Sequence, residues 1–170
     1  MRALLVIDML KDFLEEGRPL YVPQGRKIIP RIRERIREAK KEGVPVIFIC
    51  DSHLPGDMEM KIWPSHALRG SGGAEVVEEL RPEKGDYVIF KRRYSGFLGT
   101  DLDILLRELG VEEVILTGVL THICILFTAA DAFMRGYRVV IPRDSVASIS
   151  EEYHEFALKL AKEVLQAEIV

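Results

Sequence analysis

Short apolar runs alternate along the chain with longer segments whose apolar residues recur every three or four positions. We interpret the runs as six strands, at Ala3–Ile7, Val44–Cys50, Tyr87–Phe90, Val114–Thr117, Tyr137–Ile141 and Ala167–Val170. Apolar residues at helical spacing form one buried face, and this pattern predicts helices at Ile28–Glu42, Asp101–Leu109, Ile123–Arg135 and Glu151–Leu165.

Residues at the boundaries support these elements. Thr100 and Ser150 suit helix N-caps, and Gly43, Gly110 and Gly136 stand just after predicted helices, where a left-handed residue is common. Strands that are apolar throughout and separated by helices are typical of a parallel sheet covered on both faces. We therefore expect an α/β protein, a three-layer α/β/α domain with a six-stranded, mostly parallel sheet and right-handed crossovers.

Length and charge narrow the class of protein. A chain of 170 residues has the usual length of one domain, and we expect residues 1–170 to form one. Lys and Arg number 24 and Asp and Glu 27, so the net charge of −3 offers no basic surface for nucleic acid. The first apolar run ends at Asp8, too early for a signal peptide or a membrane span. We expect a cytoplasmic protein with neither nucleic acid nor membrane as a partner.

Reactive side chains follow four of the predicted strands. Asp8, Asp51, Lys91 and Cys124 stand at or beyond the carboxyl ends, where open parallel sheets bind their ligands. Cys124 lies near the start of a helix, and the helix N-terminus together with Lys91 favours its thiolate. Asp8 can take the thiol proton, and the N–H groups of Leu120 and Cys124 can bind an oxyanion. This set suits acyl transfer with Cys124 as nucleophile.

Each of these residues also has an ordinary structural interpretation. A lone Cys124 is typical of a buried small side chain, Asp8 of a hydrogen-bond acceptor, and Lys91 of a solvated charge run with Arg92 and Arg93. Their joint placement at one sheet edge favours the catalytic interpretation.

A second group of residues points to a metal. Asp51 and His53 are two positions apart at a strand end, so their side chains point the same way, and the following Gly- and Pro-rich loop adds Glu59 and His66. Such ligands suit zinc, manganese or iron. Alone, either histidine is an ordinary loop residue. Cys50 points to the opposite side from Asp51, and we assign it to the core.

The chain resembles the isochorismatase-like cysteine hydrolases, and among them the nicotinamidases. The resemblance spans nearly the whole chain and rests on the blocks 5–13, 51–53, 63–66, 91–97 and 118–124. It implies Asp8, Lys91 and Cys124 as a catalytic triad. It also implies a non-proline cis peptide between Val119 and Leu120 that directs backbone N–H groups into an oxyanion hole.

The resemblance further implies a divalent metal, which we expect to be zinc, with manganese and iron as alternatives. Asp51, His53 and His66 would bind it, and Glu59 matches an extra carboxylate ligand of one nicotinamidase subgroup. In that subgroup the metal anchors the pyridine nitrogen of the substrate.

Aromatic residues complete the expected substrate site. Phe13, Trp63 and Tyr94 would wall a flat ring, although plain packing also accounts for them. The chain departs from the usual nicotinamidase pattern at Leu120, which is bulkier than the common small residue, and at His122, which replaces an acid and is expected to change the local charge. These departures bear on the substrate and leave the thiol chemistry intact.

The expected activity is hydrolysis of nicotinamide to nicotinic acid and ammonia through a Cys124 thioester, as part of NAD salvage. The alternatives are an amidase for another small amide or ureido compound, a metal hydrolase with a structural Cys124, and a non-catalytic ligand-binding homologue. True isochorismatases typically lack the cysteine. Phe127 and Phe133 on one helix, together with the resemblance, lead us to expect a homo-oligomer.

Overall fold

A single parallel sheet forms the centre of the computed structural model, which describes residues 1–170. Its strands run in the order β3-β2-β1-β4-β5-β7, and a short strand, β6, pairs with β4. Every pairing is parallel. The bounds are β1 (Arg2–Ile7), β2 (Val46–Asp51), β3 (Tyr87–Lys91), β4 (Glu113–Val119), β5 (Arg138–Ile141), β6 (Val146–Ala147) and β7 (Glu168–Ile169).

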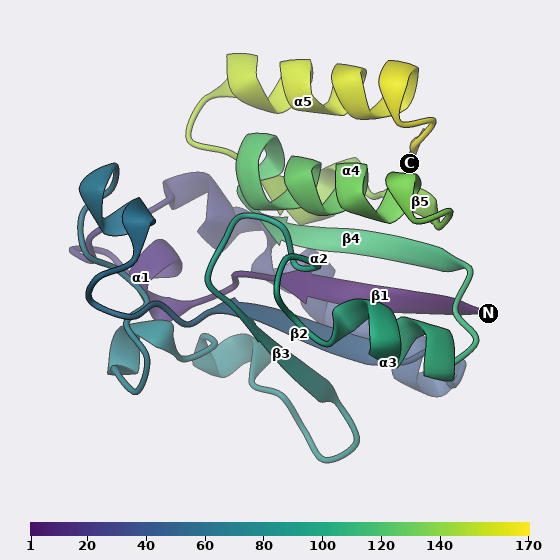
Figure 1. Ribbon diagram of the computed structural model, residues 1–170, viewed down its shortest axis with the longest axis horizontal. Coiled ribbons are helices and arrows are strands. Elements are labelled where there is room, and N and C mark those ends of the chain that lie inside the picture. The colour runs from purple at the N-terminus through teal and green to yellow at the C-terminus, as the bar shows by residue number, and fades with distance from the viewer.

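Helices cover both faces of this sheet. They are α1 (Lys11–Leu14), α2 (Pro23–Lys41), α3 (Leu102–Glu108), α4 (Leu126–Met134) and α5 (Glu151–Val164). In Figure 1, α3 and α4 lie in front of the sheet, α5 packs beyond α4, and α2 lies behind. None of these helices combines the length and the apolar composition that crossing a bilayer requires.

Alternate residues of the central strands divide the core into two parts. In β1, Leu5 and Ile7 pack with α3, α4 and α5, whereas Leu4 and Val6 pack with Ile32 and its neighbours on α2. A strand that is buried on both faces needs apolar residues at every position, and this requirement explains the continuous apolar runs. The expected three-layer α/β/α fold is confirmed.

Most predicted elements occur where the apolar pattern placed them. The helix α2 begins earlier than predicted, at Pro23, because proline suits the first position of a helix. The prediction missed β6, which at two residues is too short to produce a pattern. It also missed α1, a helix of four residues.

The predicted helix boundaries are mostly correct. The Ser150 hydroxyl accepts a hydrogen bond from the Tyr153 N–H, as expected for an N-cap. Gly136 has φ +86°, the left-handed conformation predicted for a residue after a helix. The prediction for Thr100 was wrong by one position, since Asp101 precedes α3. The Thr100 hydroxyl still accepts from the Leu102 N–H at 3.2 Å.

The carboxyl ends of the strands point to one side of the sheet, the left side of Figure 1, where the long loop after β2 also lies. The backbone is unusual at two of these ends. Asp8 has φ 51°, which is uncommon for a residue other than glycine. Gly118 has φ 114°, and a Cβ there would lie 2.0 Å from the carbonyl oxygen of Ile7. The ends of β1 and β4 therefore approach each other more closely than side chains allow.

Candidate active site

The structure brings the three predicted catalytic residues together. Asp8, Lys91 and Cys124 are all buried, although they come from three different parts of the chain. Lys91 Nζ lies 2.8 Å from Asp8 Oδ2 and 3.5 Å from Cys124 Sγ. The ammonium group thus lies between the acid and the thiol.

Asp51 contacts this group as well, and the sequence analysis, which placed it at the same sheet edge, did not predict these contacts. Its backbone N–H donates to Asp8 Oδ1 at 2.8 Å, and its Oδ1 accepts from Lys91 Nζ at 2.5 Å. The parallel register pairs Asp51 with Lys91 on the neighbouring strands, so the sheet itself sets this contact. Asp51 therefore joins the predicted catalytic residues to the predicted metal ligands.

Burial controls the protonation of these groups. It raises the pKa of Asp8 to about 6, with a further increase from the negative charge of Asp51. Burial alone lowers the pKa of Lys91, but the carboxylates of Asp51 and Asp8 outweigh it and hold that pKa well above its usual range. The site therefore contains a fixed cation beside an acid whose proton affinity is raised.

The expectation of an acidic Cys124 thiol is wrong for the protein without substrate. Burial raises the pKa of Cys124 well above its usual value, and the nearby Lys91 offsets only part of this effect. Asp8 Oδ2 is buried and has no hydrogen-bond partner, although it lies in ion-pair contact with Lys91. The acid is thus placed to take a proton from a thiol that does not lose it unaided.

The backbone around Cys124 differs from a regular helix start. The peptide bond between Val119 and Leu120 is cis, as the family resemblance implied. A π-helical turn spans Thr121–Ile125, and the Leu120 carbonyl accepts from the N–H groups of Ile123 at 3.1 Å and Ile125 at 3.2 Å. Such turns occur frequently at functional sites. The oxyanion hole at the Leu120 and Cys124 N–H groups stays a prediction.

The four predicted metal ligands also converge. Donor atoms of Asp51, His53, Glu59 and His66 all lie within 4.8 Å of one another, and all four residues are buried. His53 Nε2 lies 3.3 Å from Asp51 Oδ2 and 3.5 Å from Glu59 Oε2. Two imidazoles and two carboxylates form a donor set typical of a transition metal.

The orientation of the two imidazoles supports this assignment. His53 Nε2 is buried and has no hydrogen-bond partner, and buried polar atoms are rarely left in that state. His66 Nδ1 lies 2.7 Å from the Pro64 carbonyl oxygen, which leaves Nε2 facing Asp51. The residues therefore fit a metal ion. Asp57, which sequence reasoning did not single out, lies against His53 Nδ1 at 3.2 Å.

A cavity of about 240 Å³ opens onto both groups. It is lined by Phe13, Pro19, Leu20, Tyr21, Val22, Asp51, Glu59, Trp63, His66, Tyr94, Val119, Leu120, Ile123, Cys124 and Ile149. The predicted aromatic residues therefore face it. The Trp63 indole N–H donates to the Tyr94 hydroxyl at 3.1 Å, and the Phe13 ring centre lies 5.6 Å from that of His66. The lining includes neither lysine nor arginine.

The two residues that depart from the usual nicotinamidase pattern, Leu120 and His122, lie in different surroundings. Leu120 lines the cavity, whereas His122 does not. Instead, His122 Nδ1 lies 2.6 Å from the Ser148 hydroxyl, and the ring stacks on Tyr153 with centres 4.9 Å apart. Burial lowers the pKa of His122, which therefore adds no positive charge near neutral pH. The expected change in local charge is reduced to the loss of an acid.

The fold and this site define the class of protein, a hydrolase with a parallel, helix-covered sheet that acts on amide C–N bonds. The isochorismatase domain matches residues 2–169, and the chain belongs to that family. The resemblance found in the sequence is thereby confirmed.

Several solved structures share the fold over nearly the whole chain. A pyrazinamidase/nicotinamidase of Streptococcus mutans is 37% identical, with a TM-score of 0.95 and 100% of each chain covered. A pyrazinamidase of Pyrococcus horikoshii, solved in complex with zinc, is 37% identical with a TM-score of 0.92, covering 99% of this chain and 98% of its own. An N-carbamoylsarcosine amidase of Thermoplasma acidophilum is 38% identical with a TM-score of 0.91, covering 99% and 94%. Identity alone therefore does not choose between amide substrates.

Proposed function

We propose that the protein is a metal-assisted cysteine amidohydrolase that converts nicotinamide to nicotinic acid and ammonia. The observation that carries this proposal is the cavity itself. Its walls are mainly aromatic and aliphatic, and Cys124 lies in its lining. Three of the four predicted metal ligands, Asp51, Glu59 and His66, line it as well. A flat aromatic amide with one ring nitrogen matches these surfaces.

The first half of the reaction uses the contacts around Cys124. Because burial disfavours a free thiolate, Cys124 needs a base to lose its proton, and Asp8 accepts that proton as substrate enters. The sulfur then attacks the amide carbonyl carbon, and the N–H groups of Leu120 and Cys124 bind the oxyanion. Asp8 returns the proton to the amide nitrogen, the C–N bond breaks, and ammonia leaves a thioester on Cys124.

The second half repeats the same proton path. Asp8 takes a proton from water, and the resulting hydroxide attacks the thioester carbon. The C–S bond breaks, the sulfur recovers the proton from Asp8, and the carboxylic acid leaves. Lys91 keeps Asp8 and the sulfur in register throughout, since its ammonium contacts both. With nicotinamide as the reactant, this reaction belongs to NAD salvage.

Asp51, His53, Glu59 and His66 are the residues that would hold a metal, and zinc is our first choice because a similar pyrazinamidase contains it. When bound, the metal supplies a Lewis acid for the ring nitrogen of the substrate.

The charge of the cavity favours a neutral amide over an anionic one. Substrates such as N-carbamoylsarcosine carry a carboxylate, which a binding site usually pairs with arginine or lysine. Neither residue type lines this cavity, whereas two carboxylates, those of Asp51 and Glu59, do. The remaining alternative is another small neutral amide, and the bulk of Leu120 beside Cys124 is the feature that favours it.

The test is ammonia release from purified protein supplied with zinc, manganese or iron. Nicotinamide, pyrazinamide and N-carbamoylsarcosine form the substrate panel, Cys124→Ala is the blank, and Cys50→Ala is the matched control. Cys50 is also buried, but it belongs to the core on the other face of the sheet. Release from nicotinamide by wild type and Cys50→Ala, but not by Cys124→Ala, supports the proposal. Release only from N-carbamoylsarcosine would contradict the substrate assignment.

The proposal includes self-association with a second copy of the chain. The outer side of α5 carries an apolar stripe at helical spacing, formed by Tyr153, Phe156, the half-buried Leu160 and Val164, and Ile149 extends it just before the helix begins. Phe156 is 61% exposed, and such stripes mark interaction surfaces. Two copies of α5 that cross antiparallel at Phe156 bring Glu152 of each close to Lys159 of the other, so the stripe is complementary to itself. Monomer and dimer are distinguished by the experiment given in the Discussion.

A further inference from the structure

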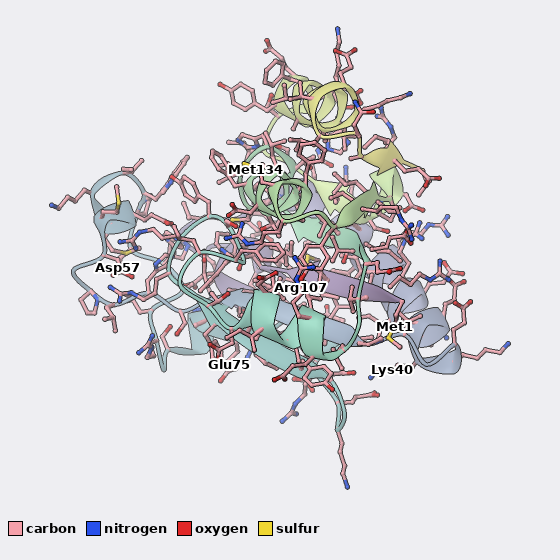
Figure 2. All side chains as sticks on the ribbon, turned by 45° about the vertical axis from the view of Figure 1, so that its right-hand side comes forward. Met1, Lys40, Asp57, Glu75, Arg107 and Met134 are labelled. Carbon is pink, nitrogen blue, oxygen red and sulfur yellow. The ribbon has the colours of Figure 1, made fainter.

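We infer that Asp57 and Arg92 form a positioning pair that fixes His53 as a metal ligand through Nε2. The inference rests on the metal site of the proposed function, and it assigns a role to two residues outside that site. Asp57 lies on the loop that follows β2, and Figure 2 labels it in this loop region at the left of the molecule.

The Asp57 carboxylate is buried against His53. Its side chain is 1% exposed, and Oδ2 lies 3.2 Å from His53 Nδ1. The same oxygen accepts from the Leu54 N–H at 3.0 Å, which holds the carboxylate to its own loop. A buried carboxylate at this distance from an imidazole nitrogen forms the second half of the carboxylate–histidine arrangement that orients many metal ligands.

Arg92 holds the other side of this carboxylate. Its Nε lies 3.1 Å from each Asp57 oxygen, and its Nη2 also bonds to Oδ1. Because the guanidinium pairs with both oxygens, the carboxylate is fixed in orientation as well as in place. Arg92 directly follows Lys91, so the pair ties the loop after β2 to the end of β3.

This arrangement determines which nitrogen of His53 carries the proton. A carboxylate paired with arginine acts only as an acceptor, so His53 Nδ1 must be the donor in their contact. The proton is then on Nδ1, and Nε2 keeps its lone pair for a metal. His53 Nε2 points to the cluster, where Asp51 Oδ2 at 3.3 Å and Glu59 Oε2 at 3.5 Å are its nearest ligating oxygens.

Removal of Asp57 should reverse this preference. Nδ1 then loses its acceptor, whereas a proton on Nε2 can donate to Asp51 or Glu59. That tautomer competes with metal binding. His66 provides an internal comparison, because its Nδ1 faces the backbone carbonyl of Pro64, which a side-chain substitution at Asp57 leaves in place.

The experiment compares wild type, Asp57→Ala and the control Asp86→Ala. The Asp86 side chain is also nearly buried, at 5% exposed, and it accepts from the Glu83 N–H at 2.8 Å and from Lys40 at 3.0 Å. It therefore has the same kinds of partners as Asp57, a backbone N–H and a cation, but touches no metal ligand. A purely structural effect of losing such a carboxylate should appear in both variants.

Two quantities are measured. The first is zinc affinity by competition with a chelator, for which we expect a loss of about 10- to 100-fold in Asp57→Ala and none in Asp86→Ala. The second is the tautomer of each histidine in metal-free protein by long-range ¹⁵N–¹H NMR. His53 should change from the Nδ1–H to the Nε2–H form in Asp57→Ala, while His66 keeps its Nδ1–H form.

If Asp57→Ala does not fold, Arg92→Gln carries the same two measurements with a smaller expected loss of zinc affinity, because the Arg92 side chain is 46% exposed. An affinity within twofold of wild type and an unchanged His53 tautomer would overturn the inference alone. Absence of zinc binding by wild type would overturn it together with the metal part of the proposed function. Ammonia release by wild type tests the amidase proposal separately.

Discussion

The backbone N–H of Asp51 donates to Oδ1 of Asp8 over 2.8 Å, and this bond joins the two halves of the site. The Asp8 side chain lies near the thiol of Cys124, whereas the Asp51 side chain contacts Lys91 and is itself one of the predicted metal ligands. A substitution at Asp51 therefore changes the partner of Lys91 as well as a metal ligand. Metal dependence is better tested at Glu59, which has no hydrogen bond or ion pair with Lys91.

Replacing Glu59 with Gln, or removing metal with a chelator, should mainly raise KM. In the proposed mechanism the metal binds the substrate ring and Cys124 attacks the carbonyl, so loss of the metal should weaken substrate binding more than chemistry. Added zinc should raise the melting temperature of wild type in a concentration-dependent way, since a ligand of the folded state stabilises it. Calorimetric scans with and without zinc check this expectation. A kcat that falls while KM stays constant would contradict the positioning role.

Gly118→Ala should destabilise the protein by at least about 2 kcal/mol. The residue has φ 114°, and its Cβ would lie 2.0 Å from the Ile7 carbonyl oxygen, a backbone atom that cannot rotate away. Gly110→Ala is the control, because Gly110 has φ 67° with open space around its Cβ position. That variant should lose only about 1 kcal/mol. Urea unfolding of both measures the difference, and equal losses would show that the contact with Ile7 is not limiting.

His154 should make the folded protein less stable on mild acidification, whereas Asp8, whose raised pKa lets the folded state take up a proton near pH 6, acts in the opposite direction. His154 Nδ1 lies 2.9 Å from the hydroxyl of Thr121, the first residue of the π-helical turn that holds Cys124. Burial lowers the pKa of His154; Glu151 and Glu155 oppose this effect, and Arg143 adds to it. The unfolded chain therefore binds a proton at a higher pH than the folded protein does. The resulting stability is present above the usual histidine pKa of about 6.5 and is lost as pH falls below it.

The variant His154→Gln should remove the part of this dependence that comes from His154. Between pH 7.5 and pH 5.5 we expect the urea midpoint of the variant to fall less, or rise more, than that of wild type, while His66 and His122, whose pKa burial also lowers, keep their part of the effect. The same pH dependence in both proteins would mean that His154 has the same proton affinity in the folded and unfolded states.

Phe156→Glu should convert a dimer to a monomer at micromolar concentration. Phe156 is the centre of the apolar stripe on α5, and a charge there cannot be buried against a second copy. Sedimentation equilibrium gives the mass directly. Ile104→Glu is the control, since Ile104 is equally exposed, at 61%, on the separate helix α3. A wild-type protein that sediments as a monomer would rule out self-association.

The sequence predicted the sheet and the convergence of the candidate site residues because both leave local signals. Apolar runs mark buried strands, and the residues at their carboxyl ends meet at one edge. The pair formed by Asp57 and Arg92 could not be predicted in this way, since their contact depends on how the loop after β2 folds against β3. The raised pKa of Cys124 also left no local signal, because it results from burial in the complete fold. The π-helical turn could not be distinguished from a helix in the sequence, because its apolar residues continue the spacing of the helix that follows it.

The strand β3 has a neighbour on one side only, and this has a consequence for inactivation by heat. An outermost strand shares fewer hydrogen bonds than a central one, so β3 opens locally at a lower free energy than the central strands β1, β2 and β4. This strand ends in Lys91, whereas Asp8 and the turn to Cys124 follow the central strands β1 and β4. Fraying of β3 would withdraw the ammonium group while the core stays intact. Catalysis would then fail at a lower temperature than the fold, and the contact of Arg92 with Asp57 would set how far apart those two temperatures are.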